Sequence, residues 1–285
     1  RMQNNIVLYS IQSITITVIG KLSFVTVALW SPTAQNAIIF KTILIFTAAV
    51  IFLKIRAKKE LSLKVDYSKK CLSQLFKYSF PLFPVTLLSM LNNSIPQLML
   101  KKYVDYSAIG IYSNAVTIAS IITILQSGFE AFWSPFVFEN YKTGQKKIVN
   151  VHHVISFGMV AIALGIIIFQ DLIYQILVGK QYWGSKEIFS LLLISPVCYT
   201  ISETLGLGIR IAKKTYLNIP VYMINIVVNV SLCYLLLPRI GVAGAAIASA
   251  SASVCMLIVK STLGERLYRC SDNYFKVIGA ILIIV

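Results

Sequence analysis

Long runs of apolar residues with almost no charge recur along this sequence. Several extend for about 18 residues or more, the length that an α-helix needs to cross about 30 Å of hydrocarbon. The chain is 57% hydrophobic and 13% charged, whereas soluble domains are about half apolar and a quarter charged. Backbone polar groups in lipid must pair within the protein, and the alternation typical of a membrane β-barrel is absent from the sequence. We therefore expect an all-α, polytopic membrane protein.

The apolar runs predict about eight complete membrane spans and a truncated ninth. The complete spans are predicted over residues 6–30, 37–53, 78–100, 108–138, 149–169, 188–209, 216–237 and 242–259. The ninth begins near Val277. Because the chain starts with Arg1 and stops within this last run, we expect both ends to be cut.

Lys and Arg residues gather in alternate connections between the predicted spans. Most of the 26 are found in the connections 54–77, 142–147, 210–214 and 260–276. The intervening connections hold Lys101, Lys102, Lys180, Lys186 and Arg239. Because cytoplasmic loops are enriched in Lys and Arg, the richer side is predicted to be cytoplasmic. Orientation in a membrane therefore explains the formal net charge of +16 better than nucleic-acid binding does, and no nucleic-acid partner is expected.

The cysteines and histidines form no recognisable metal or disulfide pattern. The five cysteines are scattered and have no CxxC spacing: Cys71, Cys198, Cys233, Cys255 and Cys270. His152 and His153 are adjacent and follow a basic segment, so we interpret them as interfacial residues. The sequence predicts no metal site and no cofactor.

Four short motifs occur at consistent places in successive predicted spans. They are Lys77-Tyr78-Ser79-Phe80-Pro81-Leu82, Gly110-Ile111-Tyr112-Ser113, Trp133-Ser134-Pro135 and Gly241-Val242-Ala243-Gly244-Ala245-Ala246. Their order and spacing resemble the polysaccharide transporter branch of the multidrug/oligosaccharidyl-lipid/polysaccharide exporter superfamily. That branch contains the O-antigen and capsule repeat-unit flippases. The motifs resemble the starts of its seventh and eighth helices, the end of the eighth, and a small-residue turn shared across the superfamily.

The resemblance implies a partial two-bundle transporter fold around a central cavity. Residues 1–53 would be the last two helices of the N-terminal bundle, 54–77 a basic cytoplasmic linker, 78–260 a six-helix C-terminal bundle, and 261–285 a cytoplasmic loop and the start of a further helix. It also implies a multi-pass protein of the bacterial plasma (inner) membrane. Family members often carry an acidic-basic pair late in the seventh helix, where this sequence has Pro96-Gln97, so the role of that pair does not transfer.

Polar residues recur every three or four positions in three of the predicted spans, so each set shares one helix face. The sets are Ser89, Asn93, Gln97 and Lys101; Ser113, Thr117, Ser120, Thr123, Ser127 and Glu130; and Asn218, Tyr222, Asn225 and Asn229. Polar atoms in hydrocarbon cost free energy unless paired, so each face is expected to pair with a neighbouring helix or to line a wet cavity. Both interpretations stay open. The candidate substrate-binding residues are Asn93, Gln97, Asn114, Asn225 and Asn229.

Lys21, Glu130 and Glu203 are charged residues within or near predicted spans, where a charge costs about 2.5–3.5 kcal/mol at a helix centre. Lys21 is a candidate for attracting a substrate phosphate. Glu130 and Glu203 are candidates for coupling to a proton or cation. The alternatives are snorkelling for Lys21, hydration or pairing with an interfacial Lys for Glu130, and a structural ion pair with Arg210 for Glu203.

Together with the resemblance, these features predict a flippase that moves an undecaprenyl-pyrophosphate-linked oligosaccharide repeat unit across the membrane by alternating access. Its partners would be the lipid-linked oligosaccharide, membrane lipids and a coupling proton or sodium ion. The alternatives are a drug/cation antiporter or a lipid II flippase of the same superfamily, or a membrane-embedded polysaccharide polymerase or acyltransferase. No acid-base or nucleophile set typical of such an enzyme stands out, so we do not expect an enzyme.

Overall fold

The computed structural model describes residues 34–60 and 82–269, together with isolated positions between residues 19 and 80. The chain forms two compact units, Arg1–Ser68 and Lys69–Val285. Every regular element among the described residues is a helix, which confirms the all-α fold class. The predicted ninth span and most of the predicted span 6–30 lie outside the described residues.

In the first unit, α2 (Ala34–Glu60) extends beyond the predicted span 37–53. Its last turns include the start of the predicted basic linker 54–77. Residues 54–60 contain Lys, Arg, Ala and Glu, which are good helix formers, and no Gly or Pro. The apolar run thus predicts the middle of the helix, and helix propensity extends it to Glu60. Residues 61–72 of that linker lie outside the described part of the chain.

The second unit begins with α4 (Leu82–Tyr103), α5 (Tyr106–Ala119), α6 (Ile121–Asn140) and α7 (Gln145–Ile168). The span predicted over 108–138 is divided into α5 and α6 at Ser120. The Ser120 hydroxyl donates to the carbonyl of Thr117, and the Thr123 hydroxyl donates to the carbonyl of Ser120. Hydroxyl bonds of this kind to the backbone bend helices, which accounts for the division.

Two short elements, α8 (Gln170–Leu177) and η1 (Lys180–Ser185), connect α7 to α9 (Lys186–Leu205). Neither is apparent from the sequence, because this connection contains no apolar run of span length. The hydroxyls of Tyr174 and Ser185 lie 3.0 Å apart and join α8 to the start of α9.

The predicted span 188–209 is interrupted at Gly206, between α9 and α10 (Leu207–Ile211). Here the backbone comes into direct contact with the last helix of the unit. A Cβ atom on Gly208 would lie 2.1 Å from the carbonyl oxygen of Gly264, and one on Gly264 would lie 2.2 Å from that of Leu205. Glycine is therefore required on both sides of this contact.

The last elements are η2 (Thr215–Leu217) and α11 (Asn218–Leu267), which bends sharply at Gly241. Gly241 has φ 56° and ψ −130°, a conformation that favours glycine. The bend lies between the predicted spans 216–237 and 242–259. Close to it the two parts of α11 touch, since a Cβ atom on Gly244 would lie 2.8 Å from the carbonyl carbon of Leu236.

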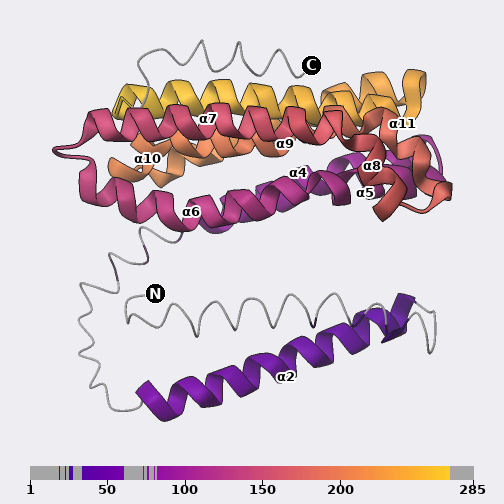
Figure 1. Cartoon of the computed structure of the whole chain (residues 1–285), viewed down its shortest axis with the longest axis horizontal. Helices are drawn as coiled ribbons and strands as arrows, with labels where there is room; N and C mark the ends of the chain where they lie inside the picture. Colours follow the sequence, from indigo (N-terminus) through magenta and orange to yellow (C-terminus); the bar gives the residue numbers. More distant parts are fainter. Residues whose placement is uncertain are drawn as a thin grey trace. The chain divides into compact units, whose positions relative to one another are not determined.

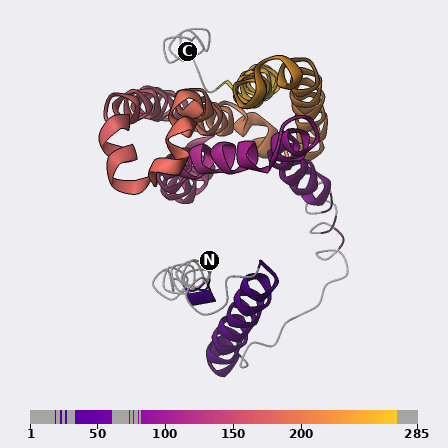
Figure 2. The same ribbon diagram turned by 90° about the vertical axis from the view of Figure 1, so that its right-hand side faces the viewer.

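The helix α9 forms the centre of the second unit. It packs against α5, α7 and α11, while α4 packs against α11, and Figure 2 shows α7 and α11 nearly end-on. Leu193, Val197 and Ile201 of α9 are fully buried. The core therefore lies along α9, and the outer helices surround it.

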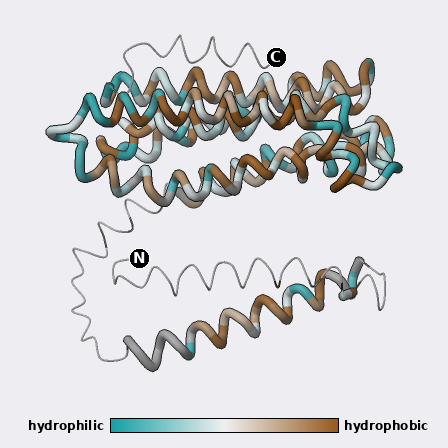
Figure 3. Tube along the Cα trace, in the orientation of Figure 1, coloured by the Kyte–Doolittle hydropathy of each residue, from teal (hydrophilic) through white to brown (hydrophobic). Residues whose placement is uncertain are grey.

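Apolar side chains also cover the outside of the second unit. On α7, for example, Val154 is 73% exposed and Ile168 is 75% exposed, and Figure 3 shows hydrophobic segments along the helices. Four stretches of the described residues are long and apolar enough to cross a membrane: Tyr106–Asn140, Gln145–Ile168, Lys180–Leu205 and Thr215–Leu267. The protein is a membrane protein by this measure of length and composition, and the total of eight or nine spans stays a prediction.

Three basic connections of the second unit meet at one end of it (Figure 1). They contain Lys142, Lys146 and Lys147; Arg210, Lys213 and Lys214; and Arg266 and Arg269. The Tyr268 hydroxyl donates to the carbonyl of Tyr141 over 2.8 Å, and Gln145 Nε2 donates to the carbonyl of Arg269 over 2.9 Å. These bonds tie the α6–α7 turn to the end of α11, so the predicted grouping of the basic connections on one side is confirmed within this unit.

Candidate functional site: a polar cavity

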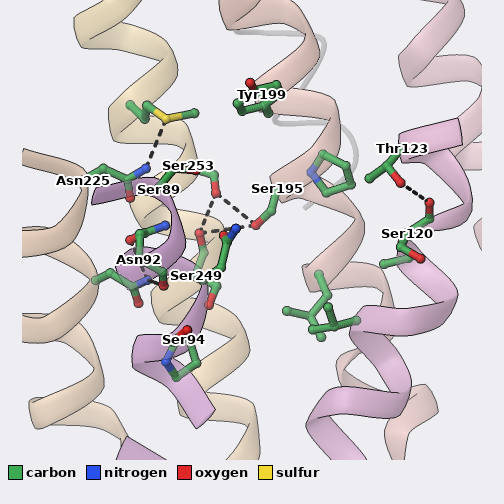
Figure 4. Close-up of a pocket in the computed structure, with 18 of the residues that line it drawn as sticks. Ser89, Asn92, Ser94, Ser120, Thr123, Ser195, Tyr199, Asn225, Ser249 and Ser253 are labelled. Atoms are coloured by element: carbon green, nitrogen blue, oxygen red, sulfur yellow. Dashed lines mark hydrogen bonds between the residues drawn. The ribbon is translucent and has the colours of Figure 1, made fainter. Parts of the chain in front are cut away.

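The second unit contains a cavity of about 640 Å³. Residues from α4, α5, α6, α9 and α11 line it. Figure 4 shows Asn92, Asn225 and Ser253 toward one side and Ser120 and Thr123 toward the other. Polar groups from all five helices therefore converge on one space between them.

The α4 wall of the cavity carries Ser89, Asn92, Asn93 and Gln97. Asn93 and Gln97, two of the candidate substrate-binding residues, thus line the cavity. Gln97 Nε2 donates to Ser113 Oγ over 3.4 Å. Asn92 was not predicted, although it follows Ser89 by three positions and so shares its helix face.

Asn225 and Asn229 of α11 face α4 and the second part of α11. Asn229 Nδ2 donates to Asn92 Oδ1 over 3.0 Å. Asn225 Nδ2 contacts the sulfur of Met256 at 3.1 Å, and its buried Oδ1 has no hydrogen-bond partner. Both predicted asparagines line the cavity, and one of them keeps an unused acceptor.

Asn114 does not line the cavity, so the structure does not group it there with the other predicted amide side chains. Its Oδ1 accepts a hydrogen bond from Ser185 Oγ over 3.1 Å, which joins α5 to η1. One position along a helix turns a side chain by about 100°, so Asn114 points away from the stripe that begins at Ser113.

Three serines on α9 and α11 form a further polar wall. Ser253 Oγ donates to Ser195 Oγ over 2.9 Å, and the hydroxyls of Tyr112 and Ser249 lie 2.9 Å apart. None of them was predicted as a site residue. The four-residue spacing of Ser249 and Ser253 within an otherwise small apolar run is the signal that could have identified this wall.

Glu130 lies in the cavity wall, so of the two interpretations left open for the stripe along α5 and α6 the structure favours cavity lining. Ser120 and Thr123 of that stripe also line the cavity, next to Gln126. Gln126 Nε2 donates to Glu130 Oε1 over 3.1 Å, which fixes one oxygen of the carboxylate.

Glu203 lies outside the cavity in a buried ion cluster. Its carboxylate pairs with Arg210, the partner expected from the sequence, and with Lys260. The Lys260 ammonium also lies 5.7 Å from the ring centroid of Tyr199, which lines the cavity. The Tyr199 hydroxyl interacts with both Glu203 and Tyr222, so the cluster adjoins the cavity without opening into it.

A sequence model of a protein family described as polysaccharide biosynthesis protein matches residues 3–187. This range is more than half of the chain. The chain belongs to the polysaccharide biosynthesis protein family. The match agrees with the resemblance to polysaccharide transporters and gives the protein a role in polysaccharide biosynthesis or export. Searches of curated proteins and of solved structures found no match.

In this polysaccharide biosynthesis protein, His152 is buried within the second unit, and its predicted position at the membrane interface stays a prediction. It is 0% exposed, and its Nδ1 lies 2.8 Å from the hydroxyl of Thr204 on α9. No group of three or more His, Cys, Asp or Glu residues suited to a metal occurs in the described part of the chain. Lys21 lies outside the described residues.

Proposed function

We propose that this polysaccharide biosynthesis protein is a flippase for an undecaprenyl-pyrophosphate-linked oligosaccharide repeat unit. The observation that carries the proposal is the cavity of about 640 Å³, lined by hydroxyl and amide groups inside a unit with an apolar exterior. A sugar chain cannot cross hydrocarbon without such a lining, because each unpaired polar group in an apolar medium costs free energy. The repeat unit would belong to a surface polysaccharide such as O-antigen or capsule.

The proposed location is the bacterial plasma (inner) membrane, with several passes and the basic end of the second unit in the cytoplasm. The positive-inside rule supports this orientation, since three basic connections meet at that end. Alternating access would then expose the cavity to each side of the membrane in turn.

Glu130 is the proposed coupling residue for a proton or sodium ion. It lines the cavity and can exchange a proton or bind a cation there. Glu203 is a weaker candidate, because Arg210 and Lys260 already neutralise it. Lys21 remains the proposed contact for the pyrophosphate.

A drug/cation antiporter is the second candidate, supported by one observation. Glu130 and the tyrosines Tyr112, Tyr199 and Tyr222 line the same cavity, and carboxylates and aromatic rings both attract cations. A lipid II flippase would share the cavity chemistry. A polymerase or acyltransferase would need reactive groups positioned against its substrate.

The test is transport by the full-length protein in proteoliposomes. A polyprenyl-pyrophosphate oligosaccharide with a fluorescent sugar label is incorporated, and an impermeant quencher reports the fraction in the outer leaflet over time. We expect faster exchange between leaflets than in protein-free vesicles or in vesicles with an unrelated membrane protein. Uptake of cationic dyes in place of this exchange would support the antiporter, and a product with a new glycosidic or acyl bond would support an enzyme.

A further inference from the structure

The cavity wall carries negative charge but no positive charge among the described residues. Among the described residues that line the cavity, none is Lys, Arg or His, and Glu130 is the only acid. All the other polar groups there are neutral hydroxyls and amides, which can each meet a sugar hydroxyl as donor or acceptor. Nothing in this wall offers a counter-charge to an anion.

Asn225 gives an independent sign of the ligand chemistry. Asn225 is 2% exposed, and its Oδ1 has no hydrogen-bond partner. Its Nδ2 contacts only the sulfur of Met256, at 3.1 Å. A buried acceptor without a partner is unfavourable, and most such atoms are paired in folded proteins. The missing partner is a hydrogen-bond donor, which the hydroxyls of any sugar supply. This acceptor therefore points to a sugar as ligand, and the choice between neutral and acidic sugars rests on Glu130.

Aromatic rings lie beside these polar groups. Tyr112, Tyr199 and Tyr222 line the cavity, and each combines an apolar ring with a polar hydroxyl. A sugar has the same two-sided character, with C–H faces and hydroxyl edges. The wall therefore suits a pyranose ring better than a purely apolar or a purely ionic ligand.

We infer that this wall is a charge-selective sugar subsite that accepts neutral or amino sugars of the repeat unit and rejects acidic ones. The inference rests on the proposed flippase function and narrows its substrate class. Glu130 provides the rejection, because its carboxylate repels a uronic acid and attracts a protonated amine. The pyrophosphate would bind outside this wall, because the wall offers it no cation among the described residues.

The experiment uses the full-length protein and three polyprenyl-pyrophosphate lipids that differ only in the terminal sugar: a neutral hexose, an amino hexose and a uronic acid. Binding to the detergent-solubilised protein and exchange in proteoliposomes are both measured without an ion gradient. We expect the affinity and the rate of leaflet exchange to be about tenfold higher for the lipids that end in a neutral or amino sugar than for the lipid that ends in a uronic acid. In Glu130→Gln this preference for the neutral lipid over the uronic acid lipid should fall to about twofold, because only the repulsive charge is removed.

Glu139→Gln is the matched control, since Glu139 is an exposed acid of the same helix that does not line the cavity. It should keep the wild-type ratio. Asn93→Asp adds an acid to the cavity wall on α4 with almost no change in size. It should lower binding of the uronic acid lipid further relative to the neutral lipid, which keeps the inference testable if Glu130→Gln does not fold.

The outcomes separate the two proposals. Absence of exchange for all three lipids contradicts the flippase, and the binding ratios then still decide on the subsite. Equal binding of the three lipids overturns the subsite, as does a binding ratio that Glu130→Gln and Asn93→Asp leave unchanged.

Discussion

The buried carboxylate of Glu203 is held by two cations from different parts of the chain. The side chains of Glu203 and Lys260 are 5% and 6% exposed, while Arg210 is 34% exposed. Taking these groups out of water is costly, and their mutual attraction offsets that cost only while all partners are present. The cluster therefore fixes α9, α10 and α11 to one another at the basic end of the unit.

Lys260→Met is expected to destabilise the protein by about 3–5 kcal/mol, because it removes a partner of a buried charge. Thermal unfolding of the purified protein in detergent measures the effect as a lower Tm. The double variant Glu203→Gln with Lys260→Met should recover part of the loss. Lys186→Met is the control: it breaks a pair with Asp171 in which the side chains are 41% and 68% exposed, and it should cost about 1 kcal/mol or less. Equal losses in both single variants would contradict a structural role for the cluster.

The variant Glu130→Gln also tests whether Glu130 couples transport to a proton or sodium ion, which is a separate question from sugar selection. The amide keeps the size and most hydrogen bonding of the side chain but cannot take up a proton or neutralise a sodium ion. In proteoliposomes this variant should still bind a neutral lipid-linked sugar but lose stimulation by an imposed proton or sodium gradient. Stimulation that persists unchanged across a range of pH would remove Glu130 from coupling.

At the level of residues, helical spacing predicts which side chains share a face. It does not predict whether that face contacts a neighbouring helix or lines a cavity. The structure places Asn93, Gln97, Asn225 and Asn229 in the lining of one cavity, a choice that the spacing alone left open. Helical spacing cannot pair Glu203 with Lys260, which is 57 positions away, because that contact depends on how two helices pack.

Glycines at the contact of α9 and α10 with α11 set how closely these helices approach. Gly264→Ala should destabilise the unit by about 1–3 kcal/mol, because its Cβ would lie 2.2 Å from the carbonyl oxygen of Leu205. Gly165→Ala in α7 is the control, since nothing lies within 4 Å of its Cβ position. It should stabilise the helix by up to about 1 kcal/mol. Denaturation midpoints of the two variants would move in opposite directions; a shared direction would contradict the close contact.

At the level of elements, apolar run length predicts the long helices well but not their interruptions. The breaks at Ser120 and Gly206 occur within single apolar runs, where hydropathy does not change. Local hydroxyl bonds at Ser120 and a backbone contact at Gly208 mark these places instead. Short elements such as α8 are missed for the opposite reason, since they lack the length that hydropathy detects.

At the level of the whole molecule, the second unit has a polar interior and two different ends. The cavity lies among α4, α5, α6, α9 and α11, and the basic connections meet at one end of those helices (Figure 1). The buried cluster of Glu203, Arg210 and Lys260 lies at the same end, because α10 and the last turns of α11 carry its cations. Opening the cavity at the basic end would therefore require the helices to separate near this cluster. The opposite end has no comparable ion cluster among the described residues.

The orientation of these two ends can be tested in intact cells with single cysteines on a background that lacks the native ones. Lys147→Cys lies on the exposed start of α7 at the basic end, and Gln181→Cys lies on exposed η1 at the other. Because the positive-inside rule places the basic end in the cytoplasm, an impermeant maleimide should label Gln181→Cys in intact cells. It should label Lys147→Cys only after the membrane is permeabilised. Labelling of both in intact cells would contradict a membrane crossing between these positions. Labelling of Lys147→Cys alone would reverse the orientation, and with it the direction in which the cavity would carry a sugar.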